Sequence, residues 1–382
     1  MPKPIKLFYY WLRQIVLVLG AIISAPFIYF FISRRKLFRP KDKPLKILVI
    51  PHLTRIGDLV CATPVFHTIK ERYPDAYLAV LVAGRIEPIL KNNPKVDEII
   101  IYRHFDLWGT IKKIRVEKFD WSFSLSGTAV SSAIAFWGLI PNRAKITRRP
   151  RPFSEILTDQ FANFKLRYAH HEYLPRYYLK LLEFIGIENP REVKEVFTSE
   201  AGEKKALEFL NKNGVGARDS FVGISVTAGN KIKEWGDEKF KELAEKIREK
   251  YGCKIIFIAS KRDEERVGKI LFRGAISATD FSLEELPSLI KRLKLFIAVD
   301  TGPIYIAHAL RVPLIDIIGP VDPLEQPPND ERSVQALPAG DIKPSSFVMK
   351  KPGRPEEHRK ATASIKVEDV LKSVERLEKF LK

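Results

Sequence analysis

The loop from His52 to Asp58 (HLTRIGD) joins a short apolar run to a stretch of helical spacing and ends on a carboxylate. Gly57 permits a tight turn, and Asp58 falls at the predicted start of the helix. An Asp at such a position commonly caps the helix by accepting a backbone hydrogen bond. If the helix start faces a cleft, the same carboxylate can act as a general base that removes a proton from a hydroxyl group. The position alone leaves both interpretations open.

A second loop, Gly223 to Trp235 (GISVTAGNKIKEW), follows an apolar run and combines small hydroxyl residues with two lysines. Ser225, Thr227 and the backbone N–H groups can bind a phosphate, and Lys231 or Lys233 can add a positive charge. The alternative is that these lysines are only solvated on a surface loop.

A third segment, Val299 to Leu310 (VDTGPIYIAHAL), reads as a buried strand that ends in Asp-Thr-Gly and leads into a helix. Thr301 and Gly302 at that helix start can offer hydroxyl and amide donors to a diphosphate. Asp300 can accept hydrogen bonds from sugar hydroxyl groups, although helix capping by Asp300 or Thr301 explains the pattern equally well. The loop 319–323 (GPVDP) follows the next strand and is expected to line the same edge.

Several motifs of metal and nucleotide chemistry do not occur in the sequence. There is no Asp-x-Asp, no G-x-x-x-x-G-K-[ST], and no pair of Cys or His residues at metal-ligand spacing. Cys61 and Cys253 are interpreted as small buried residues of a reducing compartment. We therefore expect neither a metal ion nor a cofactor. A diphosphate that leaves at this site would have to be stabilised by lysine and by helix N-termini.

The elements that position these loops are short apolar runs alternating with amphipathic stretches. Continuous apolar strands separated by helices predict parallel sheets that are covered on both faces. The predicted strands are 46–50, 78–82, 98–101 and 121–125, and then 221–226, 254–259, 295–300 and 314–318. Helices are predicted at 59–72, 173–185, 237–250, 262–271 and 282–293, with a final helix at 367–380. The basic, aromatic stretch Arg143 to Arg167 is predicted to be irregular.

The two series of strands predict an α/β protein with two doubly wound, Rossmann-like domains in tandem. The turn-rich GIENPREVKE near residue 190 suggests the passage between them. We assign residues 1–45 to an N-terminal anchor and basic linker, 46–190 to the first domain and 191–382 to the second. Ligands are expected at the carboxyl ends of the strands, in the cleft between the domains.

The N-terminal segment from Ile15 to Ser33 contains no charged residue and is about long enough to cross a bilayer. Residues 1–46 hold ten Lys or Arg against a single acid, so they carry +9 of the formal net charge of +19. A basic run beside an apolar segment predicts contact with anionic lipid. Because the denser basic cluster follows the segment, the positive-inside rule predicts a body on the cytoplasmic side of the cytoplasmic membrane. Pro26 leaves open a kinked segment that stays in one leaflet.

As a set, these motifs resemble glycosyltransferase family 9, typified by the ADP-heptose:lipopolysaccharide heptosyltransferases. The matching elements are the I-G-D of the first loop with A-T-P-V at 62–65, K-x-W at 233–235, D-T-G at 300–302 and G-P-V-D-P at 319–323. The resemblance runs from about Lys46 to the final helix. It implies a GT-B fold and an inverting, metal-independent transfer from a nucleotide-activated sugar.

The resemblance also implies roles for individual residues. Asp58 looks like the catalytic base, and Lys233 resembles the lysine that meets the donor phosphates and sugar. Asp300, Thr301 and Gly302 resemble the site of the donor sugar and diphosphate. Glu264 looks like a ligand of the donor nucleoside.

One position departs from the family pattern. The family has His three residues after the D-T-G or D-S-G triplet, whereas this chain has Tyr305, with His308 one turn later. A His one turn along can replace the usual one or merely pack, so the donor sugar is left open.

The sequence therefore predicts a membrane-bound glycosyltransferase that uses an ADP-heptose-like donor and a lipid-linked or lipopolysaccharide core acceptor. The basic stretch 145–151 (KITRRPR) offers Arg148, Arg149 and Arg151 to the acceptor, unless it is only a solvated loop. The competing hypotheses are a non-catalytic membrane scaffold and a nucleotide-sugar epimerase. Nucleic acid is not an expected partner, because no binding motif for it is recognisable.

Overall fold

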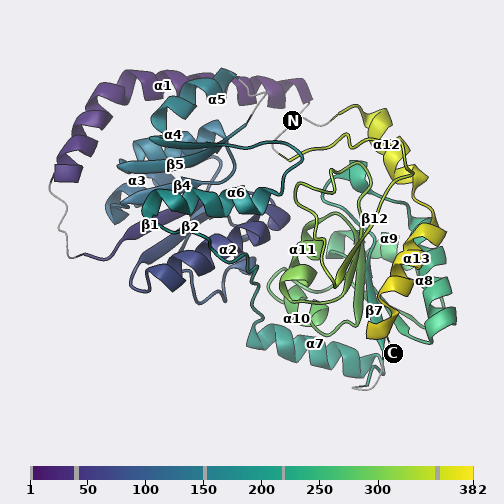
Figure 1. The fold of residues 1–382 in the computed structure, drawn as a ribbon. Coiled ribbons are helices and arrows are strands. Elements are labelled where there is room, and N and C mark those ends of the chain that lie inside the picture. Colours follow the sequence, from purple (N-terminus) through teal and green to yellow (C-terminus); the bar gives the residue numbers. More distant parts are fainter. Residues whose placement is uncertain (1–2, 38–42, 149–152, 217–219, 349–352, 382) are drawn as a thin grey trace.

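The computed structural model describes residues 3–37, 43–148, 153–216, 220–348 and 353–381. Two parallel six-stranded sheets form the cores of two α/β domains that lie side by side (Figure 1). The prediction of two α/β domains with parallel sheets is confirmed.

The first sheet has the strand order β3-β2-β1-β4-β5-β6. Its strands are β1 (Lys46–Ile50), β2 (Tyr77–Ala83), β3 (Glu98–Tyr102), β4 (Trp121–Ser124), β5 (Asn142–Thr147) and β6 (Phe164–Arg167). The α-helices of this half are α2 (Ile56–Arg72), α3 (Leu107–Glu117), α4 (Ala129–Trp137), α5 (Phe153–Thr158) and α6 (Leu174–Lys180). Short 3₁₀ helices are η1 (Glu87–Ile89), η2 (Asp159–Phe161) and η3 (Leu181–Ile185).

The second sheet repeats this topology, because its order β12-β11-β10-β7-β8-β9 is the first order read from the other side. Its strands are β7 (Phe221–Ser225), β8 (Lys254–Ile258), β9 (Ala275–Ala278), β10 (Leu295–Val299), β11 (Leu314–Ile317) and β12 (Ser333–Ala336). Its α-helices are α7 (Glu200–Lys212), α8 (Asp237–Tyr251), α9 (Glu264–Ile270), α10 (Leu286–Ile290), α11 (Gly302–Ala309), α12 (Pro355–Ser364) and α13 (Val367–Arg376). The 3₁₀ helices are η4 (Lys231–Lys233), η5 (Lys261–Asp263) and η6 (Glu378–Phe380).

Both sheets reverse their strand order at one point, between β1 and β4 in the first and between β7 and β10 in the second. Chain connections on the two sides of such a point run in opposite directions and leave a crevice at the carboxyl ends of the strands. The three loops whose residues could bind a ligand or act as a base follow β1, β7 and β10. The topology therefore places them at these crevices. The segment 186–199 links the two halves without a helix or strand, and the predicted boundary near residue 190 falls within it.

The prediction that residues 143–167 are irregular is wrong. They contain most of β5 together with α5, η2 and β6. The stretch is rich in charge, but Arg143 and Lys145 on β5 are buried. Arg143 donates to the carbonyl oxygens of Ile140 and Phe161, and Lys145 pairs with Asp159. Internal partners for these charges allow a basic sequence to form a buried strand.

The apolar N-terminal segment lies in a helix, α1 (Lys3–Leu37), that runs along the first domain over α4 and α5 (Figure 1). Ala21, Ile28 and Ile32 are buried in a small apolar cluster with Phe136 and Trp137 of α4. Within the part of the chain that the structure describes, no helix has the length and apolarity needed to cross a membrane.

Candidate active site

The loop after β1 leads directly into α2, and Asp58 is the third residue of that helix. The N-cap residue is Arg55, whose side chain makes no capping hydrogen bond, so the interpretation of Asp58 as the capping residue is wrong. The Asp58 side chain is nevertheless largely buried at the helix start. His52 lies close enough for their charges to interact; burial lowers the pKa of His52, although Asp58 acts in the opposite direction.

In the second domain, the loop after β7 and the end of β10 meet through an ion pair. Lys233 Nζ lies 2.5 Å from Asp300 Oδ2, and the hydroxyl of Tyr305 donates to Asp300 Oδ1 at 2.6 Å. Both carboxylate oxygens of Asp300 are therefore held. The alternative of a solvated lysine is wrong for Lys233, whereas Lys231 on the same short helix is exposed.

The helix α11 begins directly after this aspartate. Thr301 occupies the N-cap position, but its side chain makes no capping hydrogen bond, and Gly302 is the first helical residue. Capping by the side chain of Asp300 or Thr301 therefore does not explain the Asp-Thr-Gly sequence. The arrangement leaves the Thr301 hydroxyl and the Gly302 amide beside the Lys233–Asp300 pair, as a diphosphate site requires; the next residue, Pro303, has no N–H group to offer.

Three further predicted donor residues lie at the same edge of the sheet. Ser225 is the buried last residue of β7, and Thr227 is half-buried two residues later. Glu264 begins α9 beyond the end of β8, where it is exposed and pairs with Lys261 at 3.0 Å. Their contact with a donor stays a prediction.

The two domains touch at the starts of α2 and α11, and glycine makes the approach possible on both sides. A Cβ atom on Gly57 would lie 2.8 Å from the ring of Tyr305, and one on Gly302 would lie 2.8 Å from Cβ of Ile56. Contacts this short do not occur between real side chains, so each helix start requires a residue without a Cβ. The candidate base at Asp58 is thereby brought against the helix that carries the candidate donor site.

Tyr305 fills the position where the resembling family has His, and His308 does not replace it. His308 Nε2 contacts Asp330 Oδ2 at 2.9 Å, whereas Tyr305 binds Asp300. Burial, and then the charge of Asp300, raise the pKa of Tyr305 well above its usual range, so its hydroxyl stays protonated and donates. The sequence marked Tyr305 as a departure but did not predict its partner.

Asp316 is a buried carboxyl group that was not among the residues predicted for the site. It lies in the middle of β11, and neither of its carboxyl oxygens has a hydrogen-bond partner within the described residues. Burial, and then the charge of Asp300, raise its pKa well above the usual range, with Lys233 acting in the opposite direction. We therefore treat Asp316 as a neutral acid beneath the ion pair. The feature of the sequence that could have identified Asp316 is its place inside the apolar run LIDII.

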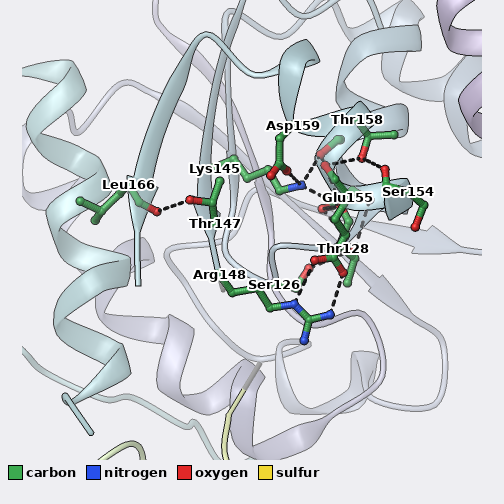
Figure 2. A network of polar contacts seen from close by, with 12 residues as sticks. Ser126, Thr128, Lys145, Thr147, Arg148, Ser154, Glu155, Thr158, Asp159 and Leu166 are labelled. Carbon is green, nitrogen blue, oxygen red and sulfur yellow. Dashed lines mark hydrogen bonds and ion pairs between the residues drawn. The ribbon is translucent and has the colours of Figure 1, made fainter. Parts of the chain in front are cut away.

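The predicted acceptor side holds a polar network at the carboxyl end of β5 (Figure 2). Arg148 donates from Nε and Nη2 to the two carboxylate oxygens of Glu155, at 2.9 and 2.8 Å. Lys145 Nζ lies 2.5 Å from Asp159 Oδ1 and donates to Ser132 Oγ at 2.7 Å. Arg148 is thus held in place at the sheet edge rather than solvated. The other two predicted acceptor residues, Arg149 and Arg151, lie outside the described residues.

Two adjacent histidines tie the first domain to the loop 319–323 and the residues after it. His171 Nδ1 lies 2.5 Å from Asp322 Oδ2, and His170 Nδ1 lies 3.0 Å from Glu325 Oε1. Both carboxylates are buried. The loop expected to line the mouth is therefore fixed from the other domain. These histidines could not be singled out from the sequence, because their partners lie about 150 residues away in the chain.

Residues 107–350 match the family model of glycosyltransferase family 9 (heptosyltransferase). The chain is 26% identical over 339 residues to lipopolysaccharide heptosyltransferase 3 of Escherichia coli strain K12, with 84% of this chain and 95% of that protein covered. Among solved structures, the family 9 glycosyltransferase of Veillonella parvula is similar with a TM-score of 0.72 and 21% identity over 88% of this chain and 97% of that one. The ADP-heptose lipopolysaccharide heptosyltransferase II of E. coli gives a TM-score of 0.69 and 20% identity, over 88% and 98%.

These matches agree with the order of motifs in the chain and with its two parallel-sheet domains. Since the family model covers more than half of the sequence, the chain belongs to glycosyltransferase family 9, the heptosyltransferase family.

Proposed function

We propose that this enzyme transfers a heptose from an ADP-heptose-like donor to a lipopolysaccharide core or another surface glycan, with inversion and without a metal ion. The donor and acceptor classes are supported by the names of its relatives, which are lipopolysaccharide heptosyltransferases and an ADP-heptose enzyme. The observation that carries the proposal is the contact between Gly57 and Tyr305, which brings the buried carboxylate of Asp58 against α11, the helix that follows the Lys233–Asp300 pair.

In the proposed step, Asp58 removes the proton from an acceptor hydroxyl group as its oxygen attacks the anomeric carbon of the donor sugar. The new glycosidic bond forms on the face opposite the leaving group, and the bond from that carbon to the diphosphate breaks. Both electrons of that bond leave with the nucleoside diphosphate, so the configuration inverts. A carboxylate suffices as the base when the attacking hydroxyl group loses its proton late, after the new bond has begun to form.

The leaving diphosphate gains negative charge, and three groups of the second domain are suited to stabilise it. Lys233 supplies a positive charge, and the Thr301 hydroxyl and the Gly302 amide supply hydrogen-bond donors. Asp300 is then free to accept hydrogen bonds from the sugar as Lys233 turns toward the phosphates. Ser225, Thr227 and Glu264 complete the proposed donor site.

The acceptor would lie on the first domain, near Arg148, Arg149 and Arg151, whose positive charges suit acidic sugars or phosphates. We further propose that the enzyme works at the cytoplasmic face of the cytoplasmic membrane, held there by its N-terminal segment. The scaffold alternative is unsupported, since the named relatives are enzymes. The epimerase alternative is set aside, because the matching family transfers sugars.

The test is a transfer assay with ADP-heptose and a lipopolysaccharide core acceptor in excess EDTA, comparing the wild type with Asp58→Asn. The matched control is Glu71→Gln, which removes a carboxylate at the other end of the same helix. We expect EDTA-resistant transfer by wild type and control, and a loss of at least about a hundredfold in the Asn variant. Transfer by Asp58→Asn at the wild-type rate would refute the role of the base, and inhibition by EDTA would refute metal independence.

A further inference from the structure

The helix α1 presents an apolar face to solvent although it is packed onto the domain. Six exposed side chains define what we call the α1 face: Ile15, Leu19, Ile22, Ile23, Phe27 and Phe30. Ile23 and Phe27 are 74% and 71% exposed. Large contiguous apolar surfaces of this kind mark sites that contact another apolar phase.

The opposite side of the helix is fixed to α4. Ala21, Ile28 and Ile32 are buried there, and Trp137 Nε1 donates to Ser24 Oγ at 3.0 Å. Gly20 lies against the Trp137 ring, where an added Cβ would come within 3.3 Å. The helix is therefore bound to the domain surface between Gly20 and Ile32. A helix that crossed a bilayer would have to give up these contacts.

The apolar surface continues beyond α1 onto neighbouring elements. A groove of about 560 Å³ lies beside α1, with Phe27 on one wall and, on the other, the exposed Trp108 of α3 and the buried Trp137 of α4. On the other flank, α5 packs against α1 and exposes Phe153. Trp and Phe at the border of an apolar surface are typical of proteins that sit at the level of lipid head groups.

The charge of the segment specifies the partner. Residues 1–46 contain ten Lys or Arg and one acid, and Arg115 of α3 lines the same groove. A positively charged segment with an apolar face complements an anionic bilayer, whereas a second copy of the chain would bring the same positive charge.

We propose that α1 lies parallel to the membrane as part of the folded first domain, with the α1 face and Trp108 inserted among the head groups of anionic phospholipid. Arg148 lies at the adjoining end of β5, beside α5, so this orientation would bring a lipid-linked acceptor to the predicted acceptor region. The surface itself goes beyond the proposed transfer reaction and does not depend on it.

The first test is flotation of the full-length protein with vesicles of phosphatidylethanolamine and phosphatidylglycerol, or of phosphatidylcholine alone. The variant is Ile23→Glu/Phe27→Glu, and the control is Leu207→Glu, an exposed apolar residue on α7 in the other domain. We expect the double variant to bind the anionic vesicles at least roughly tenfold more weakly, since each lost apolar contact changes binding by about that factor. Unchanged binding by the double variant would refute the surface, and so would binding that does not prefer anionic lipid.

The second test separates a parallel helix from a spanning one. The native cysteines are buried, and burial raises the pKa of Cys61 to about 12, so a single introduced cysteine will react selectively with maleimide. We would compare Leu12→Cys and Ser33→Cys, near the two ends of α1, on preformed vesicles with a membrane-impermeant maleimide. For a parallel helix, detergent permeabilisation changes the ratio of labelling at the two positions by less than about twofold. Labelling of one position only after permeabilisation would show a spanning helix and overturn the proposal.

Two parallel measurements distinguish lipid binding by the α1 face from dimer formation and from the transfer reaction. Sedimentation of the wild type and Ile23→Glu/Phe27→Glu without vesicles detects dimers. If the wild type is a dimer and the double variant is a monomer, the α1 face binds a second copy of the chain instead. Transfer to a water-soluble acceptor fragment is expected to be unchanged in the double variant. A wild type that lacks transfer but binds vesicles through the α1 face would refute the proposed function and leave this proposal intact.

Discussion

The ring of Tyr305 packs against Gly57, so that a Cβ atom added to Gly57 would lie 2.8 Å from the ring. Replacing Gly57 by Ala must therefore push the start of α2 away from α11 and displace Asp58 from the donor site. A displacement of about 1 Å in a catalytic group costs up to about a hundredfold in rate. We predict that Gly57→Ala lowers kcat by about tenfold to a hundredfold in the transfer assay.

The control for this substitution is Gly268→Ala on α9. Among the described residues, no atom outside the adjoining helix backbone lies within 4 Å of a Cβ added at Gly268. This variant is expected to retain wild-type kcat and to be slightly more stable, because Ala favours a helix more than Gly does. A Gly57→Ala enzyme with full kcat would mean that the contact does not position the base.

The pair of Lys233 and Lys231 offers a second test, because both lie on η4 and only Lys233 reaches Asp300. A charged hydrogen bond contributes about 1.5–3 kcal/mol, or roughly ten- to a hundredfold. We predict that Lys233→Ala lowers kcat/KM for the donor by this factor, whereas Lys231→Ala changes it less than about twofold. Equal losses in both variants would indicate general attraction of an anionic donor rather than a placed lysine.

Runs of apolar residues were sufficient to predict the central strands of both sheets, because parallel strands are buried on both faces. Strand β5 was not predicted, because charged residues such as Arg143 and Lys145 are typical of a surface loop. Only the structure shows that internal partners allow them to be buried. The Asp-Thr-Gly and K-x-W motifs predicted which loops meet, and Lys233 does contact Asp300. The partner hydroxyl of Tyr305 and the glycine contacts between the domains could not be predicted, because they depend on how two separate sheets are placed.

The buried pair of Lys145 and Asp159 makes a prediction about stability. Their side chains are 1% and 5% exposed, so removing Lys145 leaves a carboxylate without its counter-charge inside the protein. Breaking such a pair costs about 3–5 kcal/mol, whereas replacing both partners by apolar residues is often tolerated. We predict that Lys145→Met unfolds at much lower denaturant concentration than the wild type.

The double variant Lys145→Met/Asp159→Leu completes this cycle. It is expected to recover at least half of the lost free energy of unfolding, because neither charge of the pair remains. If the double variant instead loses the sum of the free energies lost in Lys145→Met and Asp159→Leu, the two residues do not interact.

Asp316 predicts a dependence of stability on pH. Its pKa is raised in the folded state, so the folded protein keeps a proton that the unfolded chain releases above about pH 4. Ionisation in the unfolded state then favours unfolding increasingly as pH rises from about 4 toward the raised folded pKa. Asp316→Asn removes this linkage. We predict that the Tm of the variant minus the Tm of the wild type is more positive at pH 8 than at pH 4.

The matching substitution at the surface is Asp75→Asn, since Asp75 is exposed. We expect it to shift Tm by a similar small amount at both pH values. A pH profile of Asp316→Asn that runs parallel to that of the wild type would mean that Asp316 is ionised in the folded protein.

The packing of α1 on α4 bears on how this enzyme can be produced. Hydrophobic leading segments are commonly deleted to obtain a protein that stays dissolved without detergent. Here a chain starting at Lys46 would lose Ala21, Ile28 and Ile32 and uncover Phe136 and Trp137, which they bury. The shortened protein would lose one exposed apolar surface and gain another. Replacing exposed apolar residues of α1 by polar ones is therefore the sounder route to a detergent-free preparation.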